Sequence, residues 1–271
     1  MTTTLIQPTS STSHRKASAM STTATATLPA AGSMARRTGP SFPALTGLEI
    51  RKSLSTRSGK AVAALAVGVG PLGVLLATLT SGGGVVAAIA LGIMGMLIAL
   101  VLLALGVLST AGEWTHKSVE RTYLLVPQRG RVLAAKATAM AVLGLVLAAV
   151  GVGLAVGTLA VVTPDVVWFA AGQAVIAVIA SGAAFAVIGA GIGAAVGNSA
   201  AAMIATYLTV LGILPVVNSV KPEIAEKLDP ASSIVTLAQH GAATTPIVVI
   251  SAWVVISTIA GIVITRRRSV A

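Results

Sequence analysis

The sequence has no cysteine, few charged residues and few aromatic residues, and these absences narrow its class. Without cysteine the chain forms no disulfide, no thiolate metal site and no cysteine nucleophile. Only 9% of its 271 residues are charged and 55% are hydrophobic, whereas soluble domains carry about 25% charged residues. The low charge therefore predicts a protein that crosses the membrane several times and builds its core within lipid.

Patterns typical of catalysis and of metal or cofactor binding are missing too. The histidines, His14, His116 and His240, have no partner at the spacing of metal ligands. The glycine-rich run 189–193 follows an apolar helix rather than a strand and has no acidic partner downstream, so it does not indicate a dinucleotide site. The GxxxxGK[ST] phosphate loop is absent. We therefore expect no catalytic residue in this chain and no bound metal or cofactor.

Six apolar runs are long enough to cross a bilayer, since a helix needs about 20 apolar residues to span the hydrocarbon core. We predict an all-α fold with six transmembrane helices at residues 61–80, 85–109, 137–162, 166–195, 200–217 and 246–265. The weakest boundary between them is Gly197-Asn198-Ser199. Pro71 and Pro215 lie inside predicted helices and should kink them.

The positions of the positive residues predict the orientation. Of the 18 Lys and Arg residues, eight precede the first apolar run, five lie in segment 113–136 and three end the last run. Such residues favour the cytoplasmic side, which places both termini in the cytoplasm and the chain in the cell membrane. The net charge of +11 is consistent with contacts between basic residues and anionic lipid headgroups. It does not indicate nucleic acid, because the positive residues flank apolar runs and form no single basic face.

Three further regions lie outside the predicted spans. Residues 1–40 have too few large apolar side chains to fold and are predicted to be a disordered cytoplasmic tail. Residues 41–60 are predicted as an amphipathic interfacial helix begun by a capping box at Thr46 and Glu49, with a loose basic linker as the alternative. Residues 221–245 form the long outer loop, either an interfacial cover over the outer mouth or a solvated loop.

Small residues recur in two of the predicted spans. Gly189, Gly193 and Gly197 follow one another at four-residue intervals. Such stripes let transmembrane helices approach closely, so we interpret the three glycines as helix-packing positions. Gly153 and Gly157 are candidates for the same role in the third span.

The predicted spans contain no ionisable side chain except Tyr207. Carriers driven by protons or sodium usually need a charged or basic group inside the membrane. Energy for transport would therefore have to enter from outside the membrane domain. The polar segment 113–136, between the second and third spans, is where we expect the chain to contact a separate ATPase.

A family resemblance supports this interpretation. Segment 113–136 resembles the cytoplasmic loop between the second and third spans of type-2 ABC export permeases, through Glu113-Trp114-Thr115, Leu124-Leu125-Val126-Pro127, Arg129, Gly130-Arg131-Val132-Leu133 and Lys136. The stretches Leu48-Glu49-Ile50-Arg51-Lys52 and Thr56-Arg57-Ser58-Gly59 resemble the N-terminal interfacial helix of that family. The topology agrees over residues 42–268, while residues 116–123 depart from the commoner Gly-Thr-containing loop.

The resemblance implies the permease subunit of an ATP-driven exporter, a homodimer working with an ABC ATPase subunit that binds ATP and Mg. Residues 110–136 would be the coupling loop. The residues implied to contact or couple to the ATPase are Glu49, Glu113, Trp114, Lys117, Glu120, Arg121 and Tyr123. Those expected to anchor lipid headgroups or the loop are Arg129, Arg131 and Lys136.

In that family the second and fifth spans line the substrate path near the dimer axis. By this analogy the candidate lining residues are Met94, Thr206, Tyr207, Thr209 and Asn218. An apolar path with few aromatic residues suits a hydrophobic or amphipathic drug, peptide or lipid. The alternatives are a stand-alone carrier or channel, and a membrane protein of immunity or signalling that transports nothing.

Overall fold

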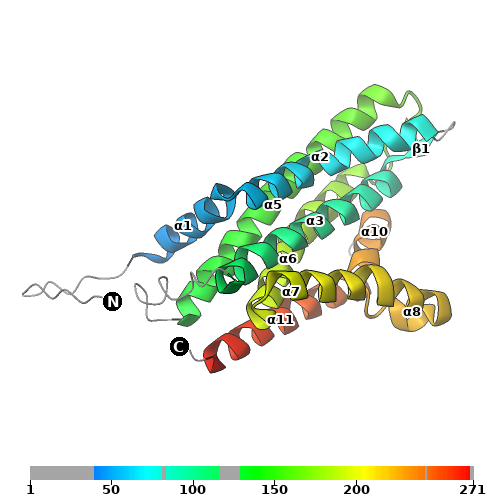
Figure 1. Cartoon of the computed structure of the whole chain (residues 1–271). Helices are drawn as coiled ribbons and strands as arrows, with labels where there is room; N and C mark the ends of the chain where they lie inside the picture. Colours follow the sequence, from blue (N-terminus) through cyan, green and yellow to red (C-terminus); the bar gives the residue numbers. More distant parts are fainter. Residues whose placement is uncertain (1–39, 81–83, 116–128, 242, 269–271) are drawn as a thin grey trace, which may run out of the picture. The chain divides into compact units, whose positions relative to one another are not determined.

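The structure is a computed structural model that describes residues 40–80, 84–115, 129–241 and 243–268. Almost all of the described chain is helical (Figure 1). In chain order the elements are α1 (Phe42–Ser55), α2 (Arg57–Thr80), β1 (Val85–Val86), α3 (Ala87–Thr115), α5 (Arg129–Val162), β2 (Val166–Val167), α6 (Ala171–Val196), α7 (Ser199–Tyr207), η1 (Leu208–Ile213), α8 (Leu214–Val220), α9 (Pro222–Ala225), α10 (Pro230–His240) and α11 (Thr244–Arg267).

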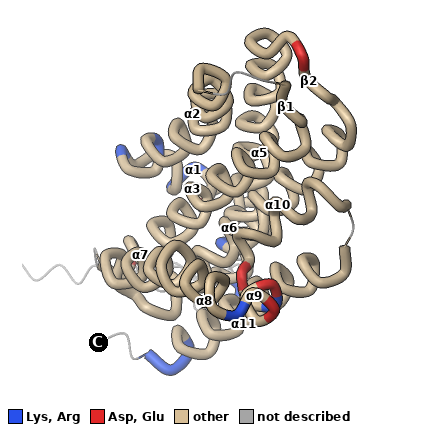
Figure 2. The backbone as a smooth tube through the Cα atoms, turned by 90° about the vertical axis from the view of Figure 1, so that its right-hand side faces the viewer, with Lys and Arg blue, Asp and Glu red and all other residues tan. Residues whose placement is uncertain are grey.

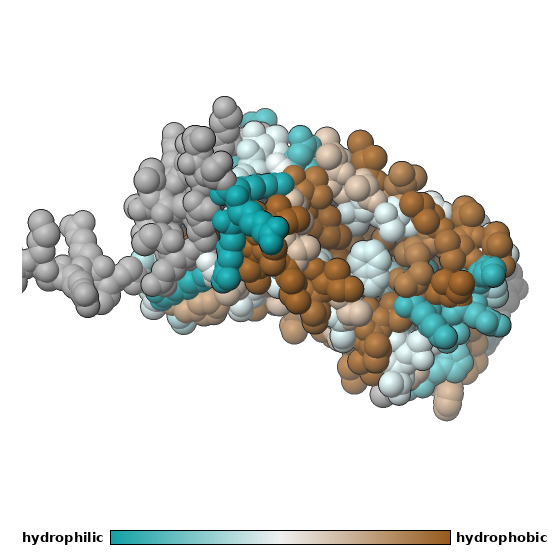
Figure 3. Space-filling model, turned by 90° about the horizontal axis from the view of Figure 1, so that it is seen from below, coloured by the Kyte–Doolittle hydropathy of each residue, from teal (hydrophilic) through white to brown (hydrophobic). Residues whose placement is uncertain are grey.

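Among the described residues, six helical stretches are long and apolar enough to cross a membrane, which confirms the predicted all-α fold with six spans. The helices extend beyond the apolar runs, because a backbone hydrogen-bond ladder continues wherever packing supports it. In particular, α3 continues to Thr115 and α5 begins at Arg129. The predicted coupling loop 110–136 is therefore helical at both of its ends. Apolar side chains cover much of the face in Figure 3, with hydrophilic groups towards its two ends.

Helices α3 and α6 form the centre of the bundle. They pack against each other, and Figure 2 shows them between α2 and α5 on one side and α7, α8 and α11 on the other. Of the six spans, α3 is the most buried, whereas α2, the fifth span and α11 are the least buried. Large buried side chains, including Leu102, Leu103 and Phe185, fill the space around α3 and α6.

Glycines allow α3 and α6 to approach to backbone contact. A Cβ on Gly193 would lie 2.8 Å from the carbonyl oxygen of Val107, and one on Gly189 would lie 3.0 Å from the Val107 nitrogen. Gly197 has a different role from Gly189 and Gly193: it is the C-cap of α6 and adopts the left-handed conformation with φ of 69°. The prediction for Gly153 and Gly157 is wrong within this chain, since no described atom comes within 4 Å of a Cβ added at either.

The junction of the fourth and fifth spans lies where the sequence placed it. Gly197 caps α6, and the side chain of Asn198 accepts a hydrogen bond of 3.0 Å from the Ala201 nitrogen at the start of α7. The fifth span then widens into the π-helical turn η1 just before Pro215. A proline has no N–H and displaces the preceding turn, and π-turns are one way in which helices absorb such a disturbance.

The start of α1 differs from the prediction. The helix begins at Phe42, with Ser41 as N-cap and Pro43 in the first turn, a favoured position for proline. The Thr46 hydroxyl donates to the Phe42 carbonyl within the helix, so the predicted capping box at Thr46 and Glu49 is wrong. The buried face of α1 carries Leu45, Glu49 and Ser53, whereas Leu48 is exposed.

The long outer segment has two parts: residues 221–224 and 226–228 are exposed, whereas α10 packs into the bundle. The Asp229 carboxylate caps α10 by accepting from the Ala231 nitrogen at 2.8 Å, and Ile234 and Ala238 on that helix are fully buried. Helix α10 packs against α3, α6 and α11. Gly92 of α3 makes this possible, because a Cβ there would lie 2.9 Å from the Cβ of Ala238.

A pair of two-residue strands joins the connections at the end of the bundle opposite α1. β1 and β2 are parallel, with Val85 opposite Val166 and Val86 opposite Val167. The pair ties the start of α3 to the connection between α5 and α6. The predicted second and fourth spans, which began at residues 85 and 166, therefore start in these strands and become helical only afterwards.

Gly189→Ala should lower the free energy of unfolding by about 1–3 kcal/mol, the usual cost of overpacking a core, because its Cβ would meet the backbone of α3. Gly153→Ala is the matched control in open space and should be neutral or slightly stabilising. Thermal unfolding of the purified chain in detergent measures both. Equal unfolding temperatures for the two variants would contradict the close contact of α3 and α6.

Candidate functional site

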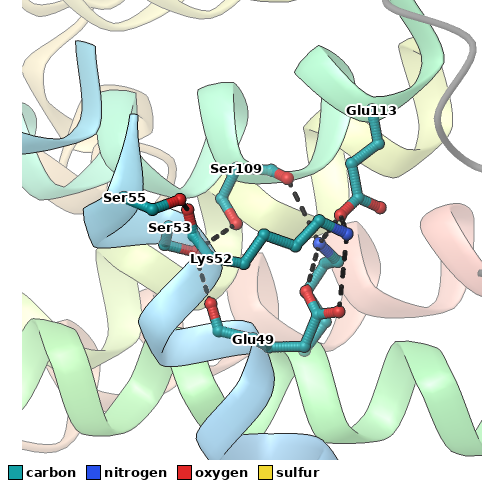
Figure 4. Close-up of polar contacts among 7 residues, drawn as sticks. Glu49, Lys52, Ser53, Ser55, Ser109 and Glu113 are labelled. Atoms are coloured by element: carbon teal, nitrogen blue, oxygen red, sulfur yellow. Dashed lines mark hydrogen bonds and ion pairs between the residues drawn. The ribbon is translucent and has the colours of Figure 1, made fainter. Parts of the chain in front are cut away.

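Four charged side chains from three helices meet at one end of the bundle (Figure 4). Glu49 and Lys52 come from α1, Glu113 from α3 and Lys136 from α5. The Lys136 ammonium lies 2.6 Å from Glu49 Oε2 and 2.8 Å from Glu113 Oε1, and it donates to the Ser109 carbonyl at 3.2 Å. We call these four residues the charged cluster, and the end of the bundle that carries them the basic end.

Lys52 completes the cluster on its exposed side. Its ammonium pairs with Glu113 and lies 3.7 Å from Glu49 Oε1. The two lysines and two glutamates thus balance one another in charge. Lys136 is only 3% exposed and Glu49 only 7%. Charges buried to this degree are tolerated only when they are paired and hydrogen-bonded.

The spacing of residues within each helix aligns the cluster. Glu49 and Ser53 lie four residues apart on one face of α1, and Ser109 and Glu113 lie four apart on one face of α3. The hydroxyls of Ser53 and Ser109 are 3.0 Å apart. Lys136 reaches both faces from the second turn of α5. The cluster therefore fastens α1, the end of α3 and the start of α5 together.

A polar cavity opens beside the charged cluster. It has a volume of about 330 Å³ and lies between the α1–α2 junction, the end of α3 and the start of α7. Hydroxyl groups provide much of its polar lining, and Ser199 of α7 contacts Thr115 of α3 at 3.3 Å between the oxygens. Among the described residues no group of three or more His, Cys, Asp and Glu side chains is placed to hold a metal ion.

A second contact at the basic end involves Arg268, just after α11. Its guanidinium donates to the carbonyls of Ala195 at 2.7 Å and Val196 at 2.9 Å, and lies 5.1 Å from the centre of the Trp114 ring. The last carbonyls of a helix lack partners within it, so the cation satisfies the end of α6. The ends of α3, α6 and α11 are thereby joined around Arg268.

The chain matches the family model of the ABC-2 family transporter proteins over residues 1–270. It belongs to the ABC-2 transporter family. The resemblance seen in segment 113–136 is thus confirmed, and a comparison with curated proteins found no match. ABC-2 family members are membrane permeases of ABC transporters and generally work with ABC ATPases. Membership and the six apolar helices together place this ABC-2 protein in the cell membrane as a multi-pass protein.

The expected coupling residues of this ABC-2 protein fall into two groups. Glu49 and Glu113 belong to the charged cluster, and Trp114 stacks beneath Arg268. The remaining four, Lys117, Glu120, Arg121 and Tyr123, lie outside the described residues. Glu113 and Lys136 thus stand on the two helices that lead into and out of residues 116–128.

The expected anchoring residues also differ in their surroundings. Lys136 is buried in the charged cluster and so does not lie at a headgroup surface, while its contact with Glu113 joins the two helices that flank residues 116–128. Arg131 donates to the carbonyl of Pro40 at 3.0 Å. The side chain of Arg129, at the start of α5, lies outside the described residues.

The expected path residues of the ABC-2 permease face different neighbours. Met94 lies against Gly73 of α2, while the Tyr207 hydroxyl donates to the Leu100 carbonyl of α3 at 2.7 Å. Thr206 and Thr209 donate to carbonyls of their own helix, and Asn218 is exposed on α8. Within the described chain, Met94 and Tyr207 therefore make packing contacts, and the five residues face no common helix.

Sequence reasoning missed Lys52 and Arg268. The three arginines 266–268 were used only to predict the orientation in the membrane. Lys52 was considered only as one basic residue of the predicted interfacial helix. One local signal existed for Arg268: a glycine, Gly197, at a helix C-terminus leaves the last carbonyls accessible to a cation. No local signal pairs Lys52 with Glu113, because their contact depends on how α1 and α3 pack.

Lys136→Met should lower the free energy of unfolding by about 3–5 kcal/mol, because it leaves two buried carboxylates without their shared cation. Lys52→Met is the matched control and should cost about 1 kcal/mol or less, since the Lys52 side chain is 40% exposed. Thermal unfolding in detergent compares them. The double variant Lys136→Met/Glu113→Gln should recover part of the loss, and equal unfolding temperatures for the two lysine variants would refute the central place of Lys136.

Arg268→Ala should destabilise the basic end by about 1–3 kcal/mol through loss of its charged hydrogen bonds and its stacking on Trp114. Arg267→Ala, which removes an exposed neighbour of equal charge, should have little effect. The fluorescence of Trp114, in a chain whose other tryptophans are phenylalanine, reports the contact directly. An unchanged Trp114 emission in Arg268→Ala would count against it.

Proposed function

We propose that this chain is the membrane subunit of an ATP-driven exporter and that residues 110–136 receive the force of a separate ABC ATPase. Family membership supports the partnership in general terms. The observation that carries the assignment to this segment is the charged cluster, in which the helices on both sides of residues 116–128 are held by one buried lysine. In this proposal the basic end is cytoplasmic, following the bias of Lys and Arg.

The mechanism follows from how the helices are joined. A push on segment 116–128 by closing ATPase subunits would reach α3 and α5 together, because Lys136 of α5 pairs with Glu113 of α3. Helix α3 in turn touches the α6 backbone at Gly189 and Gly193. Packed interfaces of this kind shift between discrete arrangements and do not deform gradually. Force applied at the basic end would thus move α3 and α6 as one unit.

We further propose that two copies form the transporter and that the fifth span faces the partner. Much of this span is exposed in the single chain, with Ile204, Leu208, Leu211 and Val216 on its surface. A substrate moving between two such surfaces would meet mostly apolar side chains. This favours a hydrophobic or amphipathic cargo, such as a drug, a peptide or a lipid.

The ATPase contact is tested by copurification. The tagged wild-type chain should retain an ABC ATPase, and Glu120→Arg/Arg121→Glu should reduce the retained ATPase at least tenfold without changing the unfolding temperature of the chain. The control Glu223→Arg changes an exposed residue of α9, at the opposite end, and should retain the wild-type amount. A wild-type chain that retains no ATPase, or two variants that retain equal amounts, would exclude the proposed contact.

A further inference from the structure

A second cavity lies near the basic end, away from the polar one. It has a volume of about 290 Å³ and is bounded by α5, α6 and α11. Helix α6 packs against both neighbours, whereas α5 and α11 have little direct contact with each other. Ala190 and Ala194 of α6 line the bottom of the gap. Leu133 and Ala134 of α5 line one side, and Ile262 of α11 lines the other. We call it the α5–α11 groove.

The groove is apolar except for a few groups near its floor. Thr110 of α3 lines it, is 2% exposed, and has a hydroxyl with no hydrogen-bond partner among the described residues. Thr265 follows the lining residue Gly261 by one helical turn on the same face, and its buried hydroxyl also lacks a partner in the described chain. Buried hydroxyls are nearly always bonded. Both hydroxyl oxygens are almost completely enclosed, so an occupant of the groove would meet mainly apolar side chains.

The end of the groove that points to the basic end carries positive charge. One turn beyond the lining residues, the Arg266 guanidinium lies against Gly130, with its Nη2 atom 3.3 Å from the position of an added Cβ. Arg131 and Arg267 are the adjacent residues in the chain. The acidic residues described at this end, Glu49 and Glu113, are both paired with lysines in the charged cluster. The charge at this end of the groove therefore favours an anion.

We propose that the α5–α11 groove binds one anionic phospholipid of the leaflet at the basic end. One acyl chain lies between Ala134 and Ile262, and the phosphate is held at Arg266. The cavity is too small for a whole lipid, being at the lower limit of small-molecule pockets of roughly 300–1,000 Å³, so the second chain stays in the bilayer. The proposal depends on the membrane location of the chain and not on the ATPase contact.

The lipid site has a consequence for the charged cluster. Lys136, which pairs with Glu49 and Glu113, also borders the groove. A bound lipid would fill the gap between α5 and α11 beside this lysine. Occupancy should therefore stabilise the basic end.

Native mass spectrometry of the full chain, purified and delipidated in detergent, tests the proposal. Phosphatidylglycerol that is added back should bind at a ratio of one lipid per chain. It should also raise the unfolding temperature of the chain. Phosphatidylcholine with the same acyl chains should be retained at least fivefold less, since it lacks the net charge that a basic residue attracts. Inorganic phosphate should have no effect. Equal retention of the two lipids would overturn the proposal.

Variants locate the site. Ala134→Trp fills the groove and should abolish the retained lipid, whereas Ala64→Trp, at an exposed alanine of α2, should not. Arg266→Gln should weaken phosphatidylglycerol binding about fivefold, and Arg57→Gln, also exposed at the basic end, should leave it unchanged. Ala134→Leu repeats the test if the tryptophan variant does not fold. Equal lipid retention by the variants at positions 134 and 64 would place the lipid elsewhere and refute the groove.

Discussion

A buried ammonium group cannot stand alone in a membrane protein, and this constraint organises the basic end of the structure. Lys136 is 3% exposed, so it needs carboxylates from whichever helices surround it. Those carboxylates are Glu49 of α1 and Glu113 of α3. The pairing makes the positions of three helices depend on one another at the basic end of the bundle. The polar segment between the second and third spans leaves and re-enters the bundle at this end.

The middle of the bundle is held in a different way. There α3 and α6 meet through backbone contacts at glycines, with no charged side chain taking part. Van der Waals contact between helices leaves little freedom for either to move alone. The charged residues Glu113 and Lys136 lie at the polar ends of their spans and not in the packed centre. In the proposed function the polar end would receive force and the packed centre would convey it.

The sequence predicted the elements better than their contacts. Hydropathy located all six spans, and Gly197-Asn198-Ser199 marked the break between the fourth and fifth, because both signals are local. The same approach could not choose between the alternatives for Lys136, since a lysine beside an apolar run has the same local sequence whether it meets headgroups or a glutamate 87 positions earlier. It could not predict the burial of α10 either. The burial of Ile234 and Ala238 depends on the close approach of α10 to Gly92 of α3, and no local pattern relates these distant segments.

The contrast between the two sides of α6 bears on how the structure can change shape. On the side of α3, an added Cβ at Gly189 or Gly193 would strike backbone atoms, and α5 approaches α6 as closely at Gly144 and Gly182. Helix α11 touches α6 at Gly191 and Gly261, but between α5 and α11 lies the α5–α11 groove. The groove is lined by side chains and not by touching backbones, so a change in its width would break no backbone contact between α5 and α11. Lys136 borders this gap while holding Glu113. In the proposed mechanism, a displacement of α3 at its polar end would therefore be accommodated between α5 and α11 and transmitted through α6.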